Sequence, residues 1–343
     1  MISWQLASKR EDLIRVESEP PALPEGWSRV RVAGCGLCHT DLGFIFSDLP
    51  TRRALPLTLG HEISGTVVEG PLAGAQVVVP AVMPCGECPA CLAGQERVCP
   101  KQLMPGNDIH GGFAELIDVP ARFLATIPVT QSPEALARLS VVADAVTTPL
   151  QAIHNLGLQA GELAVVIGCG GVGGYAALIA LARGARVVCL DIDARKLEKL
   201  AAAGVEHTLN TGGMDAAAVK DWLKDLVKAT GAPRFGHKIL ECSGSRAGQE
   251  LAFALLGFGA RVAIVGYTME KVSVRLSNLM AFDAALVGNW GASPSLYPEA
   301  IALALDGSLR LEEFTELFPL SEINAVIRRA HGEGLLRRAV LVP

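Results

Sequence analysis

The stretch ELAVVIGCGGVGGYAALIALARGARVVCLDIDARKLEKL (residues 162–200) determines the fold of the second half of the chain. It runs from an apolar strand into a glycine-rich turn, then through an apolar helix to a second strand that ends at Asp191. Gly168 permits the tight turn, Gly170 lets a pyrophosphate approach the backbone, and Gly173 lets helix and strand pack closely. Free N–H groups at the helix N-terminus favour an anion. The pattern therefore predicts a dinucleotide site.

The acid at the end of the second strand indicates which dinucleotide binds. Asp191 can accept hydrogen bonds from the adenosine ribose, and its charge would repel a 2′-phosphate, so we expect NAD rather than NADP. A glycine-rich turn in another kind of α/β protein is the alternative. The candidate cofactor contacts are Gly168, Gly170, Gly171, Val172, Gly173, Asp191 and Thr148.

The rest of the chain divides into regions of different composition. Together with the two strands above, further apolar segments make six strands, and they lie at 205–209, 237–244, 260–266 and 284–288. Helix-like stretches separate them, which predicts a doubly wound parallel sheet over about 148–288. Residues 1–147 carry short β-like runs rich in glycine and proline, and predict a partly open β domain. Residues 289–343 are expected to return to that first domain.

The overall composition narrows the possible classes of protein. The 343 residues are half hydrophobic and 19% charged, with a net charge of -5, which is typical of a packed chain long enough for two domains. The acidic balance argues against nucleic acid as a partner. The N-terminal segment MISWQLASKREDLIRVESEP has scattered charges and no signal-peptide core. We expect a cytoplasmic protein without a membrane partner.

Four of the nine cysteines lie in the segment VMPCGECPACLAGQERVCP (82–100). Cys85, Cys88, Cys91 and Cys99 have a spacing that lets four thiolates converge on one tetrahedral Zn²⁺. In a reducing compartment such a cluster favours metal binding over disulfides. Reduced thiols in a loop and a zinc finger that reads nucleic acid are the alternatives. A closed four-thiolate site has no open position for substrate, so we predict a structural zinc.

Two further stretches, AGCGLCHTDLG (33–43) and LTLGHEISG (57–65), combine cysteine, histidine and acidic residues. With the cysteine loop and the glycine motif, in this order, they resemble the zinc-containing medium-chain dehydrogenase/reductase family, the alcohol dehydrogenases. The resemblance covers essentially the whole chain. It implies a GroES-like partly open β domain, a Rossmann sheet that binds NAD, and two zinc ions per chain.

The resemblance implies a catalytic zinc held by Cys38 and His61, with an open position for the substrate oxygen. Better-known members have a third cysteine ligand, whereas the matching segment here, LSVVADAVTTPLQ (139–151), offers Asp144. An aspartate in such an apolar run needs a compensating partner, which zinc would supply. One thiolate and one carboxylate would also balance the charge of the ion. A helix N-cap is the alternative role for Asp144.

The resemblance also assigns roles around these ligands. Glu62 is a possible transient zinc ligand, and Asp41 is expected to hydrogen-bond the zinc-bound histidine, although it could simply be a turn residue. Thr40 would receive the substrate's proton, and His39 could face the pyrophosphate. Better-known members place a relay histidine shortly after the threonine, but residues 42–44 are Leu-Gly-Phe, so His39 or a water chain is the candidate for proton exit.

Three segments resemble a narrower group, the 6-hydroxycyclohex-1-ene-1-carbonyl-CoA dehydrogenases, and they are 104–122, 140–152 and 265–291. This resemblance implies oxidation of the allylic ring alcohol to 6-oxocyclohex-1-ene-1-carbonyl-CoA in anaerobic benzoyl-CoA degradation. Arg52 and Arg53 are candidate contacts for the phosphates of a CoA thioester, and a solvated pair in a loop is the alternative. The candidate apolar pocket residues are Phe44, Phe46, Met104 and Trp290, and ordinary core packing is the alternative for each of them.

Three other functions are compatible with the sequence. A broad-range zinc alcohol or polyol dehydrogenase would share every ligand, and a zinc-polarised enoyl thioester could instead accept hydride at its β-carbon. A non-catalytic NAD-binding regulator is the third, but it has no use for an open metal position. The strand-like stretch VAIVGYTMEKVSVRL (262–276) near the sheet edge favours strand-to-strand pairing, so we expect a homodimer or homotetramer.

Overall fold

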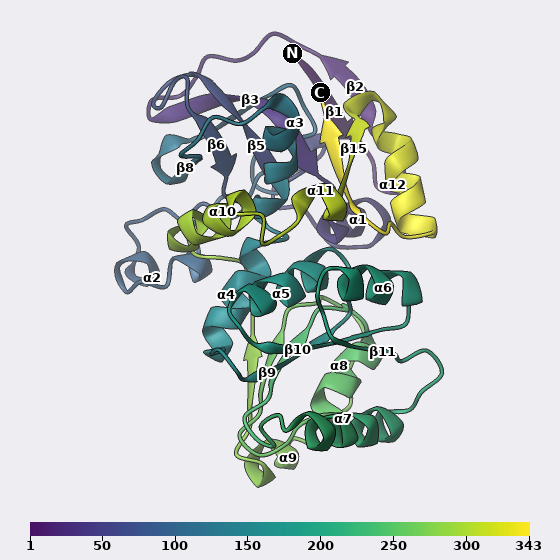
Figure 1. The fold of residues 1–343 in the computed structure, drawn as a ribbon. Helices are drawn as coiled ribbons and strands as arrows, with labels where there is room; N and C mark the ends of the chain where they lie inside the picture. The colour runs from purple at the N-terminus through teal and green to yellow at the C-terminus, as the bar shows by residue number, and fades with distance from the viewer. The chain divides into compact units, whose positions relative to one another are not determined.

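The computed structural model describes residues 1–343 and separates them into two compact units (Figure 1). Unit 1 comprises Met1–Thr147 and Gly291–Pro343, and unit 2 comprises Thr148–Trp290. The sequence analysis placed the corresponding boundaries after residues 147 and 288. None of the helices has the combination of length and apolar character that crossing a membrane requires.

Unit 2 is built on a parallel sheet of six strands in the order β11-β10-β9-β12-β13-β14. The strands are β9 (Leu163–Ile167), β10 (Arg186–Asp191), β11 (His207–Asn210), β12 (Lys238–Glu241), β13 (Arg261–Ile264) and β14 (Ala285–Gly288). The direction of strand order reverses between β9 and β12, and open α/β sheets bind their ligands at the carboxyl ends of the strands at this point. The predicted doubly wound sheet is confirmed.

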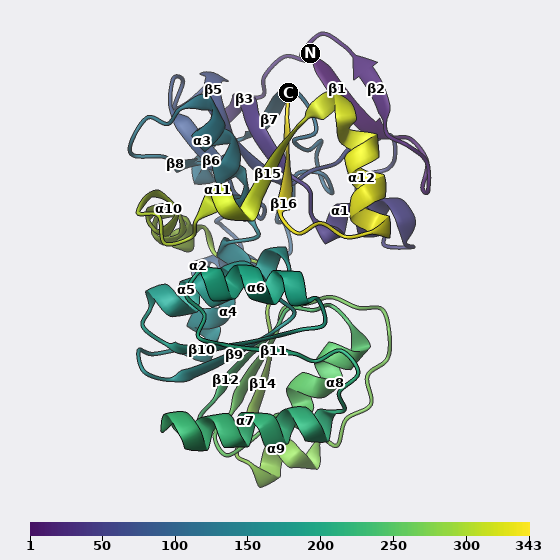
Figure 2. The same ribbon diagram turned by 45° about the vertical axis from the view of Figure 1, so that its right-hand side comes forward.

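Helices cover both faces of this sheet, with α5 and α6 on one face and α7 and α8 on the other (Figures 1 and 2). The helices are α4 (Thr147–Leu156), which starts at the unit boundary, α5 (Gly171–Ala182), α6 (Ala194–Ala202), α7 (Ala216–Thr230), α8 (Arg246–Ala254) and α9 (Ser277–Ala281). Such two-sided cover explains why the central strands β9, β10 and β12 are buried along nearly their whole length, without alternation.

Helix α7 shows how local sequence sets these helices. The Asp215 carboxylate accepts a hydrogen bond from the Ala218 N–H at 2.8 Å and so caps the first turn. Gly231 ends the helix with a φ of 64°, a left-handed conformation that glycine adopts readily. Between them, the buried residues recur at helical spacing and face the sheet core, and they are Val219, Leu223 and Val227.

Unit 1 is built from two mainly antiparallel sheets. The larger has the order β15-β16-β3-β5-β6-β8, with β7 also paired to β3, and the smaller has the order β2-β1-β4. The strands are β1 (Ile2–Leu6), β2 (Ile14–Glu17), β3 (Trp27–Gly36), β4 (Leu57–Thr58), β5 (Glu62–Glu69), β6 (Gln76–Val79), β7 (Leu116–Pro120), β8 (Ala125–Thr126), β15 (Thr315–Pro319) and β16 (Arg338–Val342). Because β16 pairs with β3, the C-terminal segment completes the larger sheet. The expected partly open β domain is confirmed.

Short helices and turns connect the strands of unit 1. The α-helices are α1 (His39–Phe46), α2 (Pro89–Leu92), α3 (Pro133–Arg138), α10 (Tyr297–Leu305), α11 (Leu311–Phe314) and α12 (Ile323–Gly332). The 3-10 turns are η1 (Glu96–Val98), η2 (Ala121–Phe123), η3 (Leu139–Ala143), η4 (Pro294–Leu296) and η5 (Leu320–Glu322). These irregular connections, rather than the strands, carry most of the residues expected to bind metal.

The stretch 262–276 differs from the prediction of a continuous strand. Only residues up to Ile264 are strand, because the chain then turns toward the end of β12. A Cβ atom on Gly266 would lie 2.2 Å from the Gly244 nitrogen, so glycine is required for this close passage. The edge of the sheet is formed instead by β14.

Candidate active site

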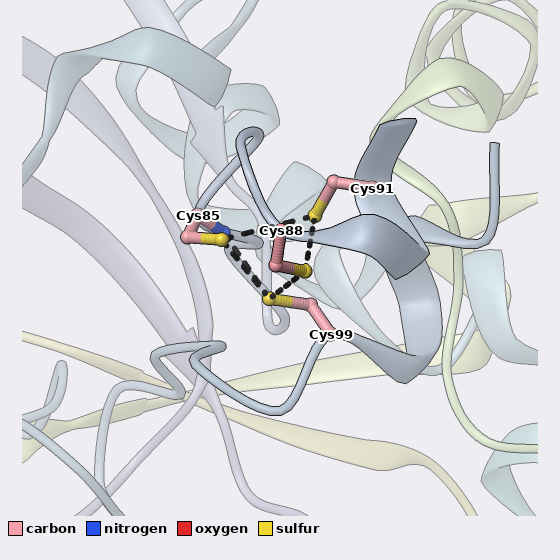
Figure 3. A group of neighbouring side chains, drawn as sticks. All are labelled: Cys85, Cys88, Cys91 and Cys99. Atoms are coloured by element: carbon pink, nitrogen blue, oxygen red, sulfur yellow. Dashed lines mark hydrogen bonds between the residues drawn. The ribbon is translucent and has the colours of Figure 1, made fainter. Parts of the chain in front are cut away.

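The four clustered cysteines of unit 1 converge on one point (Figure 3). Cys88 and Cys91 lie at helix α2, Cys99 follows η1, and Cys85 closes the group from the other side of the loop. The Sγ–Sγ distances are 3.5 Å for Cys88–Cys91, 3.7 Å for Cys88–Cys99, 3.5 Å for Cys85–Cys99 and 4.0 Å for Cys85–Cys91. Four thiolates around a tetrahedral zinc would be about 3.8 Å apart, so the group fits one ion.

A second set of ligand-type side chains comes from separate parts of unit 1. Cys38 directly precedes α1, His61 lies between β4 and β5, and Asp144 follows η3. Asp144 Oδ2 lies 3.6 Å from Cys38 Sγ and 3.4 Å from His61 Nε2. Ordinary zinc bond lengths at tetrahedral angles would give about 3.6 and 3.4 Å. The donor set therefore fits a zinc ion, and the Asp144 side chain is 20% exposed.

The electrostatics of this set also favour a bound cation. Burial opposes charge on the His61 ring, but Asp41, Cys38 and Asp144 outweigh burial and raise its pKa well above the usual range. The surroundings of the imidazole are thus strongly negative. A divalent ion would balance the Cys38 thiolate and the Asp144 carboxylate.

Asp41 is completely buried and holds the backbone on both sides of the site. Its Oδ2 accepts a hydrogen bond from the Cys38 N–H at 2.9 Å, and its Oδ1 accepts one from the Gly60 N–H at 3.1 Å. Oδ1 also lies 3.6 Å from His61 Nδ1, which has no hydrogen-bond partner. The carboxylate is placed to fix the two turns that carry Cys38 and His61, and a small shift would let it accept the ring N–H.

Glu62 is also within the second set, where the ligand atoms of Cys38, His61, Glu62 and Asp144 lie within 4.8 Å of one another. It makes a buried bidentate pair with Arg338, whose Nε donates to Oε2 at 3.0 Å while Nη2 donates to Oε1. Burial raises the pKa of Glu62, and the Arg338 charge opposes that shift. Movement of Glu62 onto a metal would therefore separate it from this guanidinium.

Sequence reasoning missed Arg338. The residue lies on β16, and its side chain is 6% exposed in the structure. Arg338 is the first residue of the strand RAVLV and directly follows Arg337, so the sequence gives little signal that this arginine is buried beside an anion. The sequence could not name that partner, because Glu62 lies 276 residues away along the chain.

The residues expected to handle the proton lie at the start of α1. Thr40 is half-buried, and its Oγ1 lies 3.7 Å from Cys38 Sγ, so the hydroxyl is at the edge of the metal site. His39 is exposed at the first position of the helix. The assignment of the proton to Thr40, and of its exit to His39, remains a prediction.

The expected pocket residues are distributed differently. Phe44 is 4% exposed and belongs to the hydrophobic core of unit 1, which is the alternative to a pocket role. It belongs to the same core cluster as Leu42 and Ile45 of α1. Phe46 stacks on His331 with ring centroids 4.0 Å apart. Met104 is buried, and Trp290 is 53% exposed in unit 2.

The basic pair of unit 1 lies on the loop between α1 and β4 and contacts a second loop, residues 107–110. Arg52 contacts Asp108 at 3.3 Å, and Arg53 lies close enough to His110 for its charge to contribute, after burial, to a lowered pKa of that ring. Asp108 and His110 belong to a loop that packs tightly on the turn before His61. A Cβ atom on Gly111 of this loop would lie 2.3 Å from the Gly60 carbonyl oxygen.

In unit 2 the glycine motif lies at the carboxyl end of β9. Gly168 has a φ of 82°, and a Cβ atom there would lie 2.4 Å from Ser243 Cα. A Cβ atom on Gly173 would lie 1.8 Å from the Gly168 carbonyl oxygen. Gly170, the N-cap of α5, faces open space, with nothing within 4 Å of a Cβ position. The turn is therefore closed on the protein side and open where a pyrophosphate would approach.

Three of the remaining candidate cofactor residues lie beside that turn, whereas Thr148 lies in α4. Gly171 and Val172 begin α5, whose first N–H groups have no partners within the helix. Asp191 ends β10, and its carboxylate accepts hydrogen bonds from Cys169 N–H at 2.6 Å and Asp193 N–H at 2.8 Å. This carboxylate thus also holds the glycine turn in place. The Thr148 carbonyl accepts a hydrogen bond from Asn289 Nδ2 at 3.2 Å.

Comparison with known proteins agrees with this geometry. Residues 24–129 match the model of the alcohol dehydrogenase GroES-like domain, and residues 171–306 match that of the zinc-binding dehydrogenase. An alcohol dehydrogenase of Geobacillus stearothermophilus is 31% identical over 320 residues, which cover 91% of both chains. Galactitol 1-phosphate 5-dehydrogenase of Escherichia coli is 30% identical over 280 residues, covering 79% of this chain and 77% of that one.

Solved structures show the same similarity. The crystal structure of galactitol-1-phosphate dehydrogenase from Escherichia coli has a TM-score of 0.90 at 26% identity, with both chains completely covered. The alcohol dehydrogenase of Aeropyrum pernix has a TM-score of 0.87 at 28% identity, again with complete coverage. The chain belongs to the zinc-type medium-chain alcohol dehydrogenase family. It is accordingly an oxidoreductase that acts on CH–OH groups with zinc and a nicotinamide dinucleotide.

The glycine turn gives a paired prediction. Gly173→Ala should lower the melting temperature by several degrees, because overpacking against the Gly168 carbonyl costs about 1–3 kcal/mol. Gly170→Ala should leave the melting temperature within about 1 °C but weaken NADH binding, because the methyl group enters only the open side of the turn. Thermal unfolding and NADH fluorescence titration measure the two effects. Equal behaviour of both variants would contradict this division of roles.

Proposed function

We propose that this protein oxidises an alcohol with NAD at a zinc ion held by Cys38, His61 and Asp144. The observation that carries the proposal is the spacing of these three side chains, which matches tetrahedral zinc coordination while Asp144 keeps a partly exposed side. Cys85, Cys88, Cys91 and Cys99 would hold the second ion in a closed set, which suits a structural role.

When bound, the zinc held by Cys38, His61 and Asp144 would polarise the substrate oxygen and lower the pKa of the alcohol. The chain's own residues do the rest. Thr40 is proposed to accept the substrate's proton and pass it outward through its hydroxyl, with His39 or water next in line. Asp41 holds the turns that carry Cys38 and His61.

Glu62 is proposed as a transient ligand when the substrate position empties. Its present partner, Arg338, opposes the rise in pKa that burial causes, and the carboxylate is 0% exposed beside the site. Arg338 would therefore determine how readily Glu62 moves, because movement of Glu62 leaves the buried Arg338 guanidinium without its partner.

The cofactor proposal rests on unit 2. The glycine turn at Gly168–Gly173 would cradle the pyrophosphate, and Thr148 would contribute from α4. Asp191 would accept a ribose hydroxyl in addition to its two backbone donors, since a carboxylate has about four acceptor positions. This supports NAD over NADP, because a 2′-phosphate would meet a buried negative charge.

For the substrate we propose a CoA thioester, 6-hydroxycyclohex-1-ene-1-carbonyl-CoA, oxidised to the conjugated ketone. The resemblance of three segments to dehydrogenases of that thioester supports it, as does the cationic Arg53 on the loop beside the His61 turn. Galactitol 1-phosphate 5-dehydrogenase is named for a phosphorylated polyol, and such a substrate would suit the same arginine. A phosphorylated polyol is therefore the second candidate.

We also propose a homodimer that pairs through the edge strand β14 and adds the α9 region to the contact. Strand β14 has one unpaired edge, and large apolar side chains are exposed around it. Their exposed fractions are 69% for Tyr267, 66% for Leu276, 79% for Met280, 42% for Leu286 and 53% for Trp290. An exposed apolar edge favours pairing with another strand.

The metal-binding thiols suit a reducing compartment, so we place the enzyme in the cytoplasm.

The ligand set is tested by Asp144→Asn. This change removes the charge that balances the zinc, so bound zinc should fall from two ions to one per chain, and kcat/KM by about 100-fold or more. NADH binding should not change, whereas a non-catalytic regulator would show no turnover before or after the change. Asp12→Asn, at an exposed ion pair of unit 1, is the control. Retention of both ions and of full activity would contradict the assignment of Asp144.

The substrate proposal is tested by following NADH absorbance with the thioester, with cyclohex-2-enol and with galactitol 1-phosphate. Turnover should be confined to the thioester, and Arg53→Gln should lower its kcat/KM by about 10-fold, because a charge-assisted hydrogen bond to phosphate is lost. Arg15→Gln, which alters another exposed arginine of unit 1, is the control. Comparable turnover of the free alcohol would leave a broad-range dehydrogenase, and turnover of the phosphorylated polyol alone would replace the thioester.

The dimer proposal is tested by Leu286→Asp. A charge at the centre of β14 should shift the protein from dimer to monomer, as measured by size-exclusion chromatography with light scattering. Val129→Asp places the same charge at a 62% exposed apolar position of unit 1 and should leave the mass unchanged. A dimer that survives Leu286→Asp would rule out pairing through this edge.

A further inference from the structure

Tyr297, at the start of α10, makes two buried hydrogen bonds that join separate parts of unit 1. Its hydroxyl donates to the Ala143 carbonyl at 2.6 Å and accepts from the Ala81 N–H at 3.0 Å. The side chain is 1% exposed, so water does not compete for these bonds. Nothing in the mechanism above uses this residue.

One of these bonds acts on the backbone that presents Asp144. Ala143 is the residue directly before it, and the same carbonyl also accepts a hydrogen bond from Thr147 Oγ1 at 3.0 Å. Asp144 has φ −142° and ψ −59°, so the chain leaves the 3-10 turn η3 abruptly at this residue. Two hydroxyl donors therefore fix the peptide whose orientation sets the direction of the Asp144 side chain.

The other bond acts on the entry to the cysteine loop. Ala81 lies shortly before Met83, whose backbone pairs with Leu103 through two hydrogen bonds of 2.9 Å and so closes the base of that loop. The segment before Tyr297 makes a second contact with the loop, since the Ser293 hydroxyl donates to Glu96 Oε2 at 2.6 Å. Residues 293–297 thus connect the cysteine loop to the backbone of η3.

We propose that Tyr297 is a positioning residue that sets the Asp144 carboxylate for metal binding and ties it to the base of the cysteine loop. The inference rests on the proposed function, because it takes Asp144 as a ligand. It adds α10 to the C-terminal elements around the site, where Arg338 of β16 already pairs with Glu62. Outer residues that orient a metal ligand typically change metal affinity by about 10–100-fold when they are replaced.

The test is Tyr297→Phe in the full chain, with the catalytic ion replaced by Co²⁺. The variant should bind Co²⁺ at this site about 10–100-fold more weakly and with an altered visible spectrum, while the zinc of the cysteine loop stays bound. Competition with a chelator measures the affinity, and elemental analysis counts the retained zinc. Ser28→Ala removes a comparable buried hydroxyl, which donates to the Pro71 carbonyl at 2.5 Å, and should leave both properties unchanged.

Wild-type Co²⁺ affinity and spectrum in Tyr297→Phe would overturn the inference. If that variant does not fold, Thr147→Val removes the other hydroxyl from the Ala143 carbonyl at nearly constant volume, and unchanged Co²⁺ binding there would overturn it equally. Asp144→Asn, measured in parallel, separates the role of Tyr297 from the assignment of Asp144 as a ligand. Loss of Co²⁺ in Asp144→Asn without loss in Tyr297→Phe leaves the proposed function standing and removes only the role of Tyr297. Retention of Co²⁺ in Asp144→Asn removes the ligand assignment itself.

Discussion

The concentration of negative charge around His61 is the constraint on which unit 1 depends. Cys38, Asp41 and Asp144 surround a buried imidazole, and the nearby Glu62 carboxylate is paired with Arg338. Unpaired charges in such surroundings would be strongly destabilising. A divalent cation would balance these negative charges. The stability of this region and the proposed chemistry therefore both require a bound metal ion.

The fold meets that requirement by placing the ligands on turns between strands. Cys38 starts α1, His61 precedes β5, and Asp144 follows η3, so no strand has to bend to bring them together. The strands supply rigidity instead, with β3 at the centre of the larger sheet between β5 and β16. This is how a β domain with an irregular rim can hold side chains at coordination distances.

The two units differ in how they prepare for a ligand. In unit 1 the metal ligands are pre-positioned by buried hydrogen bonds, such as those of Asp41 to two backbone N–H groups. In unit 2 the cofactor turn is shaped by the absence of side chains, since Gly168 and Gly173 leave no room for a Cβ atom. Buried hydrogen bonds thus shape the metal site of unit 1, and close backbone packing shapes the glycine turn of unit 2.

The sequence by itself determined the features that depend on local spacing. The glycine motif could be recognised because it joins a strand to the start of a helix within a short segment. The zinc site of Cys85, Cys88, Cys91 and Cys99 could be predicted from their spacing without knowledge of distant segments. The tertiary structure alone decided that Arg338 pairs with Glu62 and that Tyr297 donates a hydrogen bond to Ala143. Each of these depends on which segments meet in space, and side-chain contacts between residues far apart along the chain leave no periodic pattern in the sequence.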